Sequence, residues 1–297
     1  MVRIFHTFAC VGTWEMTMLN FTPAKTEQNR QPSHTDEAVS EPTLTIAILT
    51  KNEAHRIASC LHSAAFADQI IVVDSGSTDS TREIALAEGA EVFNYPDWQG
   101  FAVQRNRLLQ HARCDYIFFL DADERITPEL QDELLAAVRS GKRAVWKVQW
   151  RMVAFQHELK YFRSDAKIER LFRRDMVREF TGVVHEQALL EIEPTPRVLL
   201  KGRLLHHSRE TVRGSLEKLT QYSMLGAAKR AENGKRGGVL RGLLSGSSMF
   251  LRLYIGQRGI LCGGPGFLYC FVVGLEGFFR YAALAYDHDS LRTDIPR

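Results

Sequence analysis

Short apolar runs alternate with amphipathic segments along the first half of this chain, and this alternation restricts the fold more than any other feature. The apolar runs are as short as buried strands and lie at 43–50, 69–74, 91–94 and 116–120. A segment with helical spacing follows each run, at 53–65, 80–88, 101–112 and 128–138. Buried strands separated by helices are typical of a parallel sheet that helices cover on both faces. The sequence therefore predicts an α/β, Rossmann-like fold with a mostly parallel sheet.

The remainder of the chain has a different pattern. Three further segments are rich in apolar residues and are predicted strands: 144–152, 166–173 and 198–206. From residue 215 onward the spacing is helical. The first 42 residues stand apart, because their second half is polar and contains three prolines. We therefore divide the chain into a disordered leader at 1–42, an α/β domain at 43–210 and a helical region at 211–297.

Charge is distributed unevenly over the sequence. The formal net charge is only +3, but residues 201–297 carry 15 basic and 7 acidic residues. A basic region of this kind indicates an anionic partner, such as nucleic acid, anionic lipid or a phosphorylated sugar. No nucleic acid is expected, because the aromatic residues of this region cluster in an apolar segment and do not alternate with Lys and Arg.

The apolar part of the helical region runs from 259 to 275 without a charged residue. Three glycines and a proline at 263–266 interrupt it, so the continuous helix is expected to be too short to cross a bilayer. We predict that this region lies on an anionic membrane surface, with packing on the α/β domain as the alternative. Five cysteines without a C-x-x-C pair indicate a reducing compartment. These features predict a cytoplasmic protein, peripheral on the inner face of the cytoplasmic membrane.

Acidic side chains follow three of the predicted strands, at the positions where each strand ends. Glu53 follows the first strand, Asp74 ends the second, and Asp121 and Asp123 follow the fourth. In an open α/β sheet, ligands bind beyond the carboxyl ends of the strands. Asp74 opens a D-S-G-S-T-D turn, where a carboxylate can accept hydrogen bonds from a nucleobase or ribose. Neighbouring carboxylates repel each other unless a cation lies beside them, so the D-x-D predicts a Mg²⁺ or Mn²⁺ site that substrate phosphates complete.

Several blocks of this sequence resemble the signature blocks of glycosyltransferase family 2, whose members have a GT-A fold. These blocks are LTIAILTKNEAHRIASCLHSA, IIVVDSGSTDSTREIA, WQGFAVQRNRLL and YIFFLDADERITPEL. Later blocks resemble the branch that contains lipopolysaccharide inner-core β-1,4-glucosyltransferases, which act on a heptose. They are IERLFRR, VVHEQAL and LLHHSRETVRGSLEKLTQYS, followed by an R-G-x-x-x-G-G-x-G-F segment. The resemblance extends from about residue 43 to residue 286 and implies that 43–210 is a GT-A catalytic domain.

The resemblance implies roles for the acidic residues in binding a UDP-sugar. Glu53 and Asp74 would contact the uracil and the ribose. Asp121 would contact the ribose or the metal, and Asp123 would bind the metal. Arg105, in Q-R-N, stands where the branch usually has Lys and would lie near the nucleotide.

The resemblance also implies a catalytic base and a second metal ligand. Glu186 is the first choice for the base, because it matches the H-E pair of the branch, and Asp165 is the alternative. His185 is a further candidate for a metal ligand. For the neighbouring His206 and His207, a structural or acceptor-contact role is favoured over a metal site, since adjacent strand residues point to opposite faces.

The implied reaction is a metal-assisted single displacement with inversion at the anomeric carbon of a UDP-sugar, with glucose as the expected sugar. The acceptor would be a heptose of lipopolysaccharide core or a related glycan. Two alternatives remain: transfer to another acceptor, such as a polysaccharide, lipid carrier or protein, and a D-x-D phosphatase. The phosphatase is disfavoured, because its motif ends the first strand of the sheet, whereas the D-x-D of this chain follows the fourth.

Overall fold

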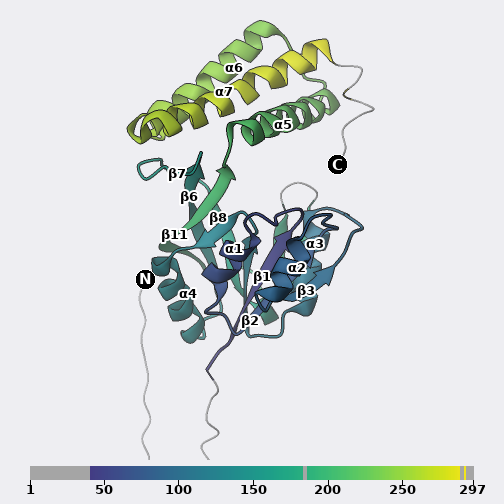
Figure 1. The fold of residues 1–297 in the computed structure, drawn as a ribbon, viewed down its shortest axis with the longest axis vertical. Coiled ribbons are helices and arrows are strands. Elements are labelled where there is room, and N and C mark those ends of the chain that lie inside the picture. Colours follow the sequence, from purple (N-terminus) through teal and green to yellow (C-terminus); the bar gives the residue numbers. More distant parts are fainter. Residues whose placement is uncertain (1–40, 183–185, 288–290, 292–297) are drawn as a thin grey trace, which may run out of the picture. The chain divides into compact units, whose positions relative to one another are not determined.

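A computed structural model describes residues 41–182, 186–287 and 291 of the chain (Figure 1). All of these residues fall within one compact unit, Glu41–Arg297. The predicted leader lies outside the described residues, apart from Glu41 and Pro42.

Eleven strands and seven α-helices make up the described chain. The strands are β1 (Leu44–Thr50), β2 (Gln69–Asp74), β3 (Glu91–Asn94), β4 (Tyr116–Asp121), β5 (Glu124–Ile126), β6 (Val145–Ala154), β7 (His157–Glu158), β8 (Lys167–Arg173), β9 (Val177–Thr181), β10 (Gln187–Leu190) and β11 (Arg197–Arg209). The helices are α1 (Ile57–Ala64), α2 (Thr81–Ala87), α3 (Phe101–His111), α4 (Pro128–Arg139), α5 (Val212–Glu232), α6 (Val239–Leu251) and α7 (Gly263–Tyr286).

The central sheet is mixed, with the strand order β3-β2-β1-β4-β8-β6-β11-β5. The strands β3, β2, β1 and β4 pair in parallel, whereas β8 is antiparallel to both β4 and β6. In the parallel part, Thr50 of β1 is opposite Asp74 of β2, and Leu49 is opposite Asp121 of β4. This register brings the acidic ends of three strands to the same edge of the sheet, as the sequence predicts.

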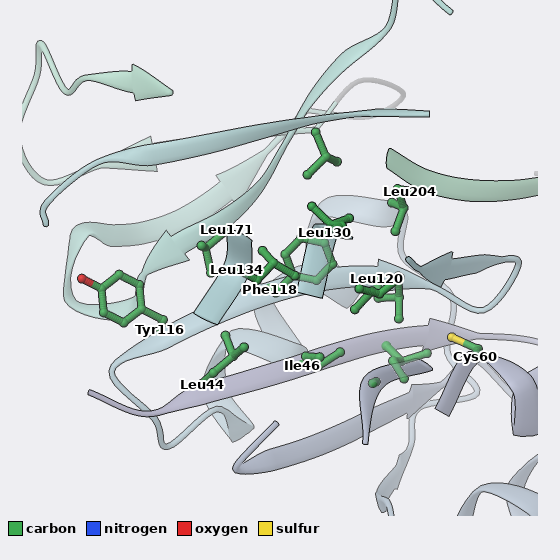
Figure 2. Close-up of a cluster of buried hydrophobic side chains, with 14 of the residues drawn as sticks. Leu44, Ile46, Cys60, Tyr116, Phe118, Leu120, Leu130, Leu134, Leu171 and Leu204 are labelled. Carbon is green, nitrogen blue, oxygen red and sulfur yellow. The ribbon is translucent and has the colours of Figure 1, made fainter. Parts of the chain in front are cut away.

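Alternating side chains of β1 enter two cores on opposite faces of the sheet. Leu44, Ile46 and Ile48 pack with α1 and α4 on one face, where Figure 2 shows Leu44 and Ile46 near Phe118 and Leu134. On the other face, β1 residues pack with α3 and with the β9–β10 hairpin. Helices therefore cover both faces of the sheet, and the predicted α/β fold class is confirmed.

The predicted strands and helices of residues 43–138 agree with the structure to within a few residues. The later strands are also present, as β6, β8 and β11. The short strands β5, β7, β9 and β10 were not predicted.

One prediction about the helical region is wrong. The glycines and proline at 263–266 do not break α7, which is continuous over 24 residues. Pro265 occupies the third position of the helix, where a backbone N–H has no partner within the helix, so its missing donor costs nothing. By length and composition, Gly259–Tyr286 is apolar enough to cross a membrane, and 33% of its most apolar window is buried.

Candidate active site

The loops after β1 and β2 are fixed to each other by hydrogen bonds from side chains. Asn52 has a φ of 55°, and its Oδ1 accepts a hydrogen bond of 2.8 Å from the backbone N–H of Thr78. The Glu53 N–H donates to the hydroxyl of Thr81 at 2.8 Å. Burial raises the pKa of the Glu53 carboxyl, although its ion pair with Arg56 acts to lower it. Glu53 is therefore held at the sheet edge, at the position predicted for a nucleotide contact.

Asp74 is fully buried and has a role within its own loop. Its Oδ2 accepts hydrogen bonds from the backbone N–H groups of Gly76, at 3.1 Å, and Ser77, at 2.8 Å. The Ser77 hydroxyl donates to Oδ1. Gly76 has a φ of 81°, which a residue with a side chain rarely adopts. Loop capping thus accounts for Asp74 in the structure, and its predicted contact with the nucleotide stays a prediction.

Arg105 joins two of the predicted site residues. Its Nε donates to Glu186 Oε1 at 2.8 Å, and its Nη2 lies 3.4 Å from Asp121 Oδ1. The side chain projects from α3, whereas Asp121 ends β4 and Glu186 precedes β10. The structure therefore brings the predicted base and the first aspartate of the D-x-D to the same guanidinium group.

A second arginine, which the sequence analysis missed, lies on the other side of Asp121. Arg170 of β8 is 4% exposed, and its Nη2 lies 2.6 Å from Asp121 Oδ2 and 2.7 Å from Glu124 Oε1. Burial acts to raise the pKa of Asp121, but the guanidinium groups of Arg170 and Arg105 together hold this pKa well below its usual range. Asp121 is therefore ionised in the absence of a metal.

Glu124 is the other residue of this network that the sequence analysis missed. It is fully buried and accepts hydrogen bonds from the indole N–H of Trp150, at 2.6 Å, and from the backbone N–H of Asp121, at 2.9 Å. Burial raises the pKa of Glu124 to about 7, although Arg170 opposes the shift. Glu124 thus fixes the backbone at the start of the D-x-D.

Asp123, the second aspartate of the D-x-D, faces a histidine. The Nε2 atom of His206 lies 3.4 Å from Asp123 Oδ2. Although burial disfavours the imidazolium, the hydrogen bond to Asp123 raises the pKa of His206. The other ring nitrogen, Nδ1, is buried and has no hydrogen-bond partner among the described residues. The sequence analysis favoured other roles for His206, because only the fold brings β11 beside the D-x-D.

The donor set around Asp123 fits a hard divalent cation. The carboxylate of Asp123 is a ligand that Mn²⁺ and Mg²⁺ prefer, whereas the imidazole of His206 suits a transition metal such as Mn²⁺ better than Mg²⁺, and only in its neutral form. The described residues contain no group of three or more His, Cys, Asp or Glu side chains that could hold a metal ion. Substrate phosphates would therefore have to complete the coordination, which is usual for Mg²⁺ in phosphate-binding sites.

A cavity of about 620 Å³ opens beside this network. Arg105, Asp121, Arg170 and Glu186 line it, together with Trp150 of β6. The volume is within the range of small-molecule sites.

Four of the other predicted site residues, Glu53, Asp74, Asp123 and Asp165, are not among the residues that line this cavity. The carboxylate of Asp165 is exposed, accepts a hydrogen bond of 2.7 Å from Gln257 and lies 3.5 Å from Arg252. His185 lies outside the described residues.

Comparisons with known proteins agree with these features. The family model described as "Glycosyl transferase family 2" matches residues 45–188, which include every strand end described above. The lipopolysaccharide core biosynthesis glycosyltransferase LpsC of Rhizobium meliloti (strain 1021) is 30% identical over 261 residues, covering 84% of this chain and 94% of LpsC. A glycosyltransferase of Rickettsia prowazekii (strain Madrid E) is 28% identical over 254 residues, covering 80% of this chain and 85% of the relative.

Among solved structures, the chain is similar to glucosyl-3-phosphoglycerate synthase from Mycobacterium tuberculosis in complex with phosphoglyceric acid. The TM-score is 0.43 and the identity 20%, over 57% of this chain and 73% of the other. The sequence match to LpsC, over nearly the whole of that protein, is the stronger finding. The chain is a glycosyltransferase that belongs to glycosyl transferase family 2 and has the α/β, GT-A fold of that family.

Proposed function

We propose that this enzyme transfers a sugar, glucose, from a UDP-sugar to a heptose of lipopolysaccharide core or a related glycan. The observation that carries this proposal is the cavity in which Arg105, Asp121 and Glu186 meet beside the D-x-D. The relative LpsC, whose name assigns it to lipopolysaccharide core biosynthesis, supports the class of acceptor. Membership in a glycosyltransferase family argues against the phosphatase alternative, whereas another glycan, lipid or protein acceptor remains the second candidate.

The donor would bind along the carboxyl edge of β1, β2 and β4. Glu53 and Asp74 are proposed to contact the uracil and ribose, directly or through the loop that Asp74 shapes. Asp123 would hold a Mn²⁺ or Mg²⁺ ion, and a neutral His206 would add a ligand if the ion is Mn²⁺; the ion would supply Lewis-acid stabilisation of the charge that develops on UDP as it leaves. Asp121 is proposed to orient the ribose or contribute to that metal site. Its pairing with Arg105 and Arg170 fixes the carboxylate in one position.

Glu186 is the proposed catalytic base. Its carboxylate lines the cavity and is held by Arg105, so it is both accessible and oriented. It would remove the proton from the acceptor hydroxyl while that oxygen attacks the anomeric carbon from the face opposite UDP. One displacement of this kind inverts the anomeric configuration. Asp165, the alternative base, is exposed and lies outside the cavity, which favours Glu186.

Replacing Glu186 tests this assignment. The variant Glu186→Gln should lose transfer to the acceptor by at least 100-fold, since general-base catalysis is worth about 10²–10⁴ in rate. Binding of UDP, measured by calorimetry, should be retained. Glu179→Gln is a matched control, because Glu179 is an exposed carboxylate on β9 of the same hairpin. Wild-type turnover in Glu186→Gln would refute the assignment, and loss in Asp165→Asn would favour the alternative.

A screen for UDP release identifies the donor and the metal. The purified enzyme is given UDP-glucose and other UDP-sugars, each with Mn²⁺, Mg²⁺ or EDTA. We expect release with UDP-glucose and a divalent ion only. Mass spectrometry of lipopolysaccharide from a strain that lacks the enzyme then identifies the acceptor, and an unchanged core would refute the proposed acceptor. We further propose that the enzyme acts in the cytoplasm, in contact with the inner face of the cytoplasmic membrane.

A further inference from the structure

The helices α6 and α7 pack against each other through glycine, and they lie side by side in Figure 1. A Cβ atom on Gly246 would lie 2.9 Å from the carbonyl oxygen of Gly274, and one on Gly242 would lie 2.8 Å from the carbonyl oxygen of Phe278. A Cβ on Gly277 would lie 3.3 Å from the Cα of Gly246. The contact between the two helices therefore depends on small residues that allow the backbones to approach closely.

The leucine side chains of α6 are exposed, whereas Phe250 of the same helix packs against Phe267 and Phe271 of α7. Leu240 is 70% exposed, Leu244 65% and Leu251 50%, and these residues follow each other at spacings of one and two helical turns. Further exposed apolar side chains lie on α6, in the turns after it and on α7; they are Leu243, Ile255, Ile260, Leu261, Phe267 and Phe271. In a helix pair that packs in water, leucine fills the contact and small or polar residues face outward. This pair has the opposite arrangement, which is typical of helices surrounded by lipid.

The charges that the chain carries along this apolar segment all have one sign, and an acidic side chain from outside it, Asp165, lies 3.5 Å from Arg252. Between Glu232 and Glu276 the chain has no acidic residue, whereas it has five basic ones. They are Lys235, Arg236, Arg241, Arg252 and Arg258. Four of them flank the two ends of α6, and the fifth lies at its first turn. An apolar face with basic residues at its borders matches the hydrocarbon and headgroup layers of an anionic leaflet.

A basic hollow borders the same surface. Lys229, Arg230 and Lys235 line a cavity of about 480 Å³, together with Tyr281. The guanidinium carbon of Arg230 lies 5.3 Å from the centre of the Tyr281 ring. The hollow adjoins the start of α6, where the Gly238 N–H donates to the Tyr281 carbonyl at 2.9 Å. Three cations in one hollow favour an anionic group such as a lipid phosphate.

We propose that α6, α7 and the turns between them insert their apolar face into the hydrocarbon of one anionic leaflet and lie in the plane of the membrane. Arg241 and Arg252 are 11 residues apart, which is about 16 Å of helix and about half of a bilayer core. Glu276 of α7 is paired with Arg209 of β11, and both are buried. An α7 that crossed the bilayer would draw this ion pair into hydrocarbon. This inference rests on the membrane contact that the proposed function includes, and it does not depend on which sugar or acceptor the enzyme uses.

Flotation of the full-length enzyme with lipid vesicles tests the proposal. Wild-type protein should float with vesicles that contain 30 mol% phosphatidylglycerol and much less with pure phosphatidylcholine. The combined substitution Leu240→Gln, Leu244→Gln and Leu251→Gln should weaken binding at least tenfold, because three half-exposed leucines no longer enter the hydrocarbon. The matched control is Leu86→Gln with Ile192→Gln. These two residues are 59% and 61% exposed and lie outside the helical region, so binding should not change.

A depth measurement keeps the test decisive even if the triple variant folds poorly. Tryptophan at position 244, in Leu244→Trp, should be quenched by lipids that carry bromine on the acyl chain, beyond the quenching of wild type. Tryptophan at position 86, in Leu86→Trp, should not be. Unquenched Leu244→Trp, or equal flotation of wild type and triple variant, would overturn the proposal.

The apolar face could instead bind a second copy of the chain. Light scattering without vesicles would reveal it as a dimer that the triple variant dissociates, and this result would also overturn the proposal. UDP binding, measured without vesicles in every variant, reports on the proposed function separately. If the wild-type protein does not bind UDP, this result counts against the UDP-sugar proposal and not against membrane insertion.

Discussion

Removal of Arg170 is the perturbation whose effect the structure defines best. One guanidinium nitrogen serves two carboxylates, Asp121 at 2.6 Å and Glu124 at 2.7 Å. In Arg170→Met, Asp121 keeps its contact with Arg105, whereas Glu124 keeps only hydrogen bonds from Trp150 and a backbone N–H. Glu124 is fully buried, so its charge would be left without a counterion.

The expected cost is large and depends on pH. Breaking a buried ion pair by removing one partner costs about 3–5 kcal/mol, and we expect this loss in the free energy of unfolding at pH 8.5. The pKa of Glu124 is about 7 in the folded protein, against 4.5 as the ordinary value, so between pH 4.5 and 7 the folded state binds a proton that the unfolded state lacks. Wild type therefore loses stability as the pH rises from 4.5 to 7.

The pH dependence of the penalty follows from the same titration. At pH 5.5, Glu124 is protonated with or without Arg170, so the part of the penalty that comes from its unpaired charge disappears. At pH 8.5, which is 1.5 units above a pKa of about 7, the ion pair is present in wild type only. Each pH unit is worth about 1.4 kcal/mol, so the penalty should be smaller at pH 5.5 by up to about 2 kcal/mol.

Urea denaturation at the two pH values, in buffer with EDTA, measures both quantities. Lys167→Met is the matched control, because Lys167 lies on the same strand and is exposed, and it should change stability by less than about 0.5 kcal/mol. A penalty below about 1 kcal/mol for Arg170→Met would refute the argument from burial. A penalty that is equal at both pH values would refute the assignment of the titration to Glu124.

Two further predictions concern packing and the metal. Gly202→Ala should destabilise the protein by about 1–3 kcal/mol in urea denaturation, since a Cβ there would lie 2.5 Å from the Cα of Leu130. Gly256→Ala should be nearly neutral, because a Cβ at position 256 would meet no neighbouring atom within 4 Å. Equal losses of stability in both variants would contradict the packing argument. Asp123→Asn and His206→Gln should each weaken Mn²⁺ binding in the presence of UDP at least tenfold by calorimetry, whereas unchanged affinity in both would show that the metal binds elsewhere.

Most of the sheet could be predicted, because each buried strand of residues 43–138 carries its own signal. The apolar runs are short and continuous, as in strands that are buried on both faces, and the segments between them have helical spacing. Strand direction in the second half could not be predicted. The antiparallel β8 lies between two strands that precede it in sequence, β4 and β6, and no local pattern specifies such an insertion.

The site was predictable where its residues follow recognisable strands or stand in the blocks that resemble the family. The D-x-D and Asp74 follow recognisable strands, so the register of the sheet brought them together as expected. Arg170 was missed, and the contact of His206 with Asp123 was not predicted, because both residues reach the D-x-D from β8 and β11 through pairings that span tens of residues. The prediction that glycine and proline would interrupt α7 was wrong, because the helix propensity of a residue type applies to the interior of a helix, whereas these residues lie in its first turn.

The ion pair between Arg209 and Glu276 has a consequence for the choice of acceptor. Arg209 ends the strand that carries His206, and Glu276 belongs to the helix proposed to rest in the leaflet. With α7 in the leaflet as proposed, this ion pair would help to set the height of the reaction centre above the lipid surface. A glycan that grows outward from a lipid anchor would then be modified only at the sugar that reaches this height. The enzyme would select its acceptor by distance from the membrane as well as by the shape of the sugar.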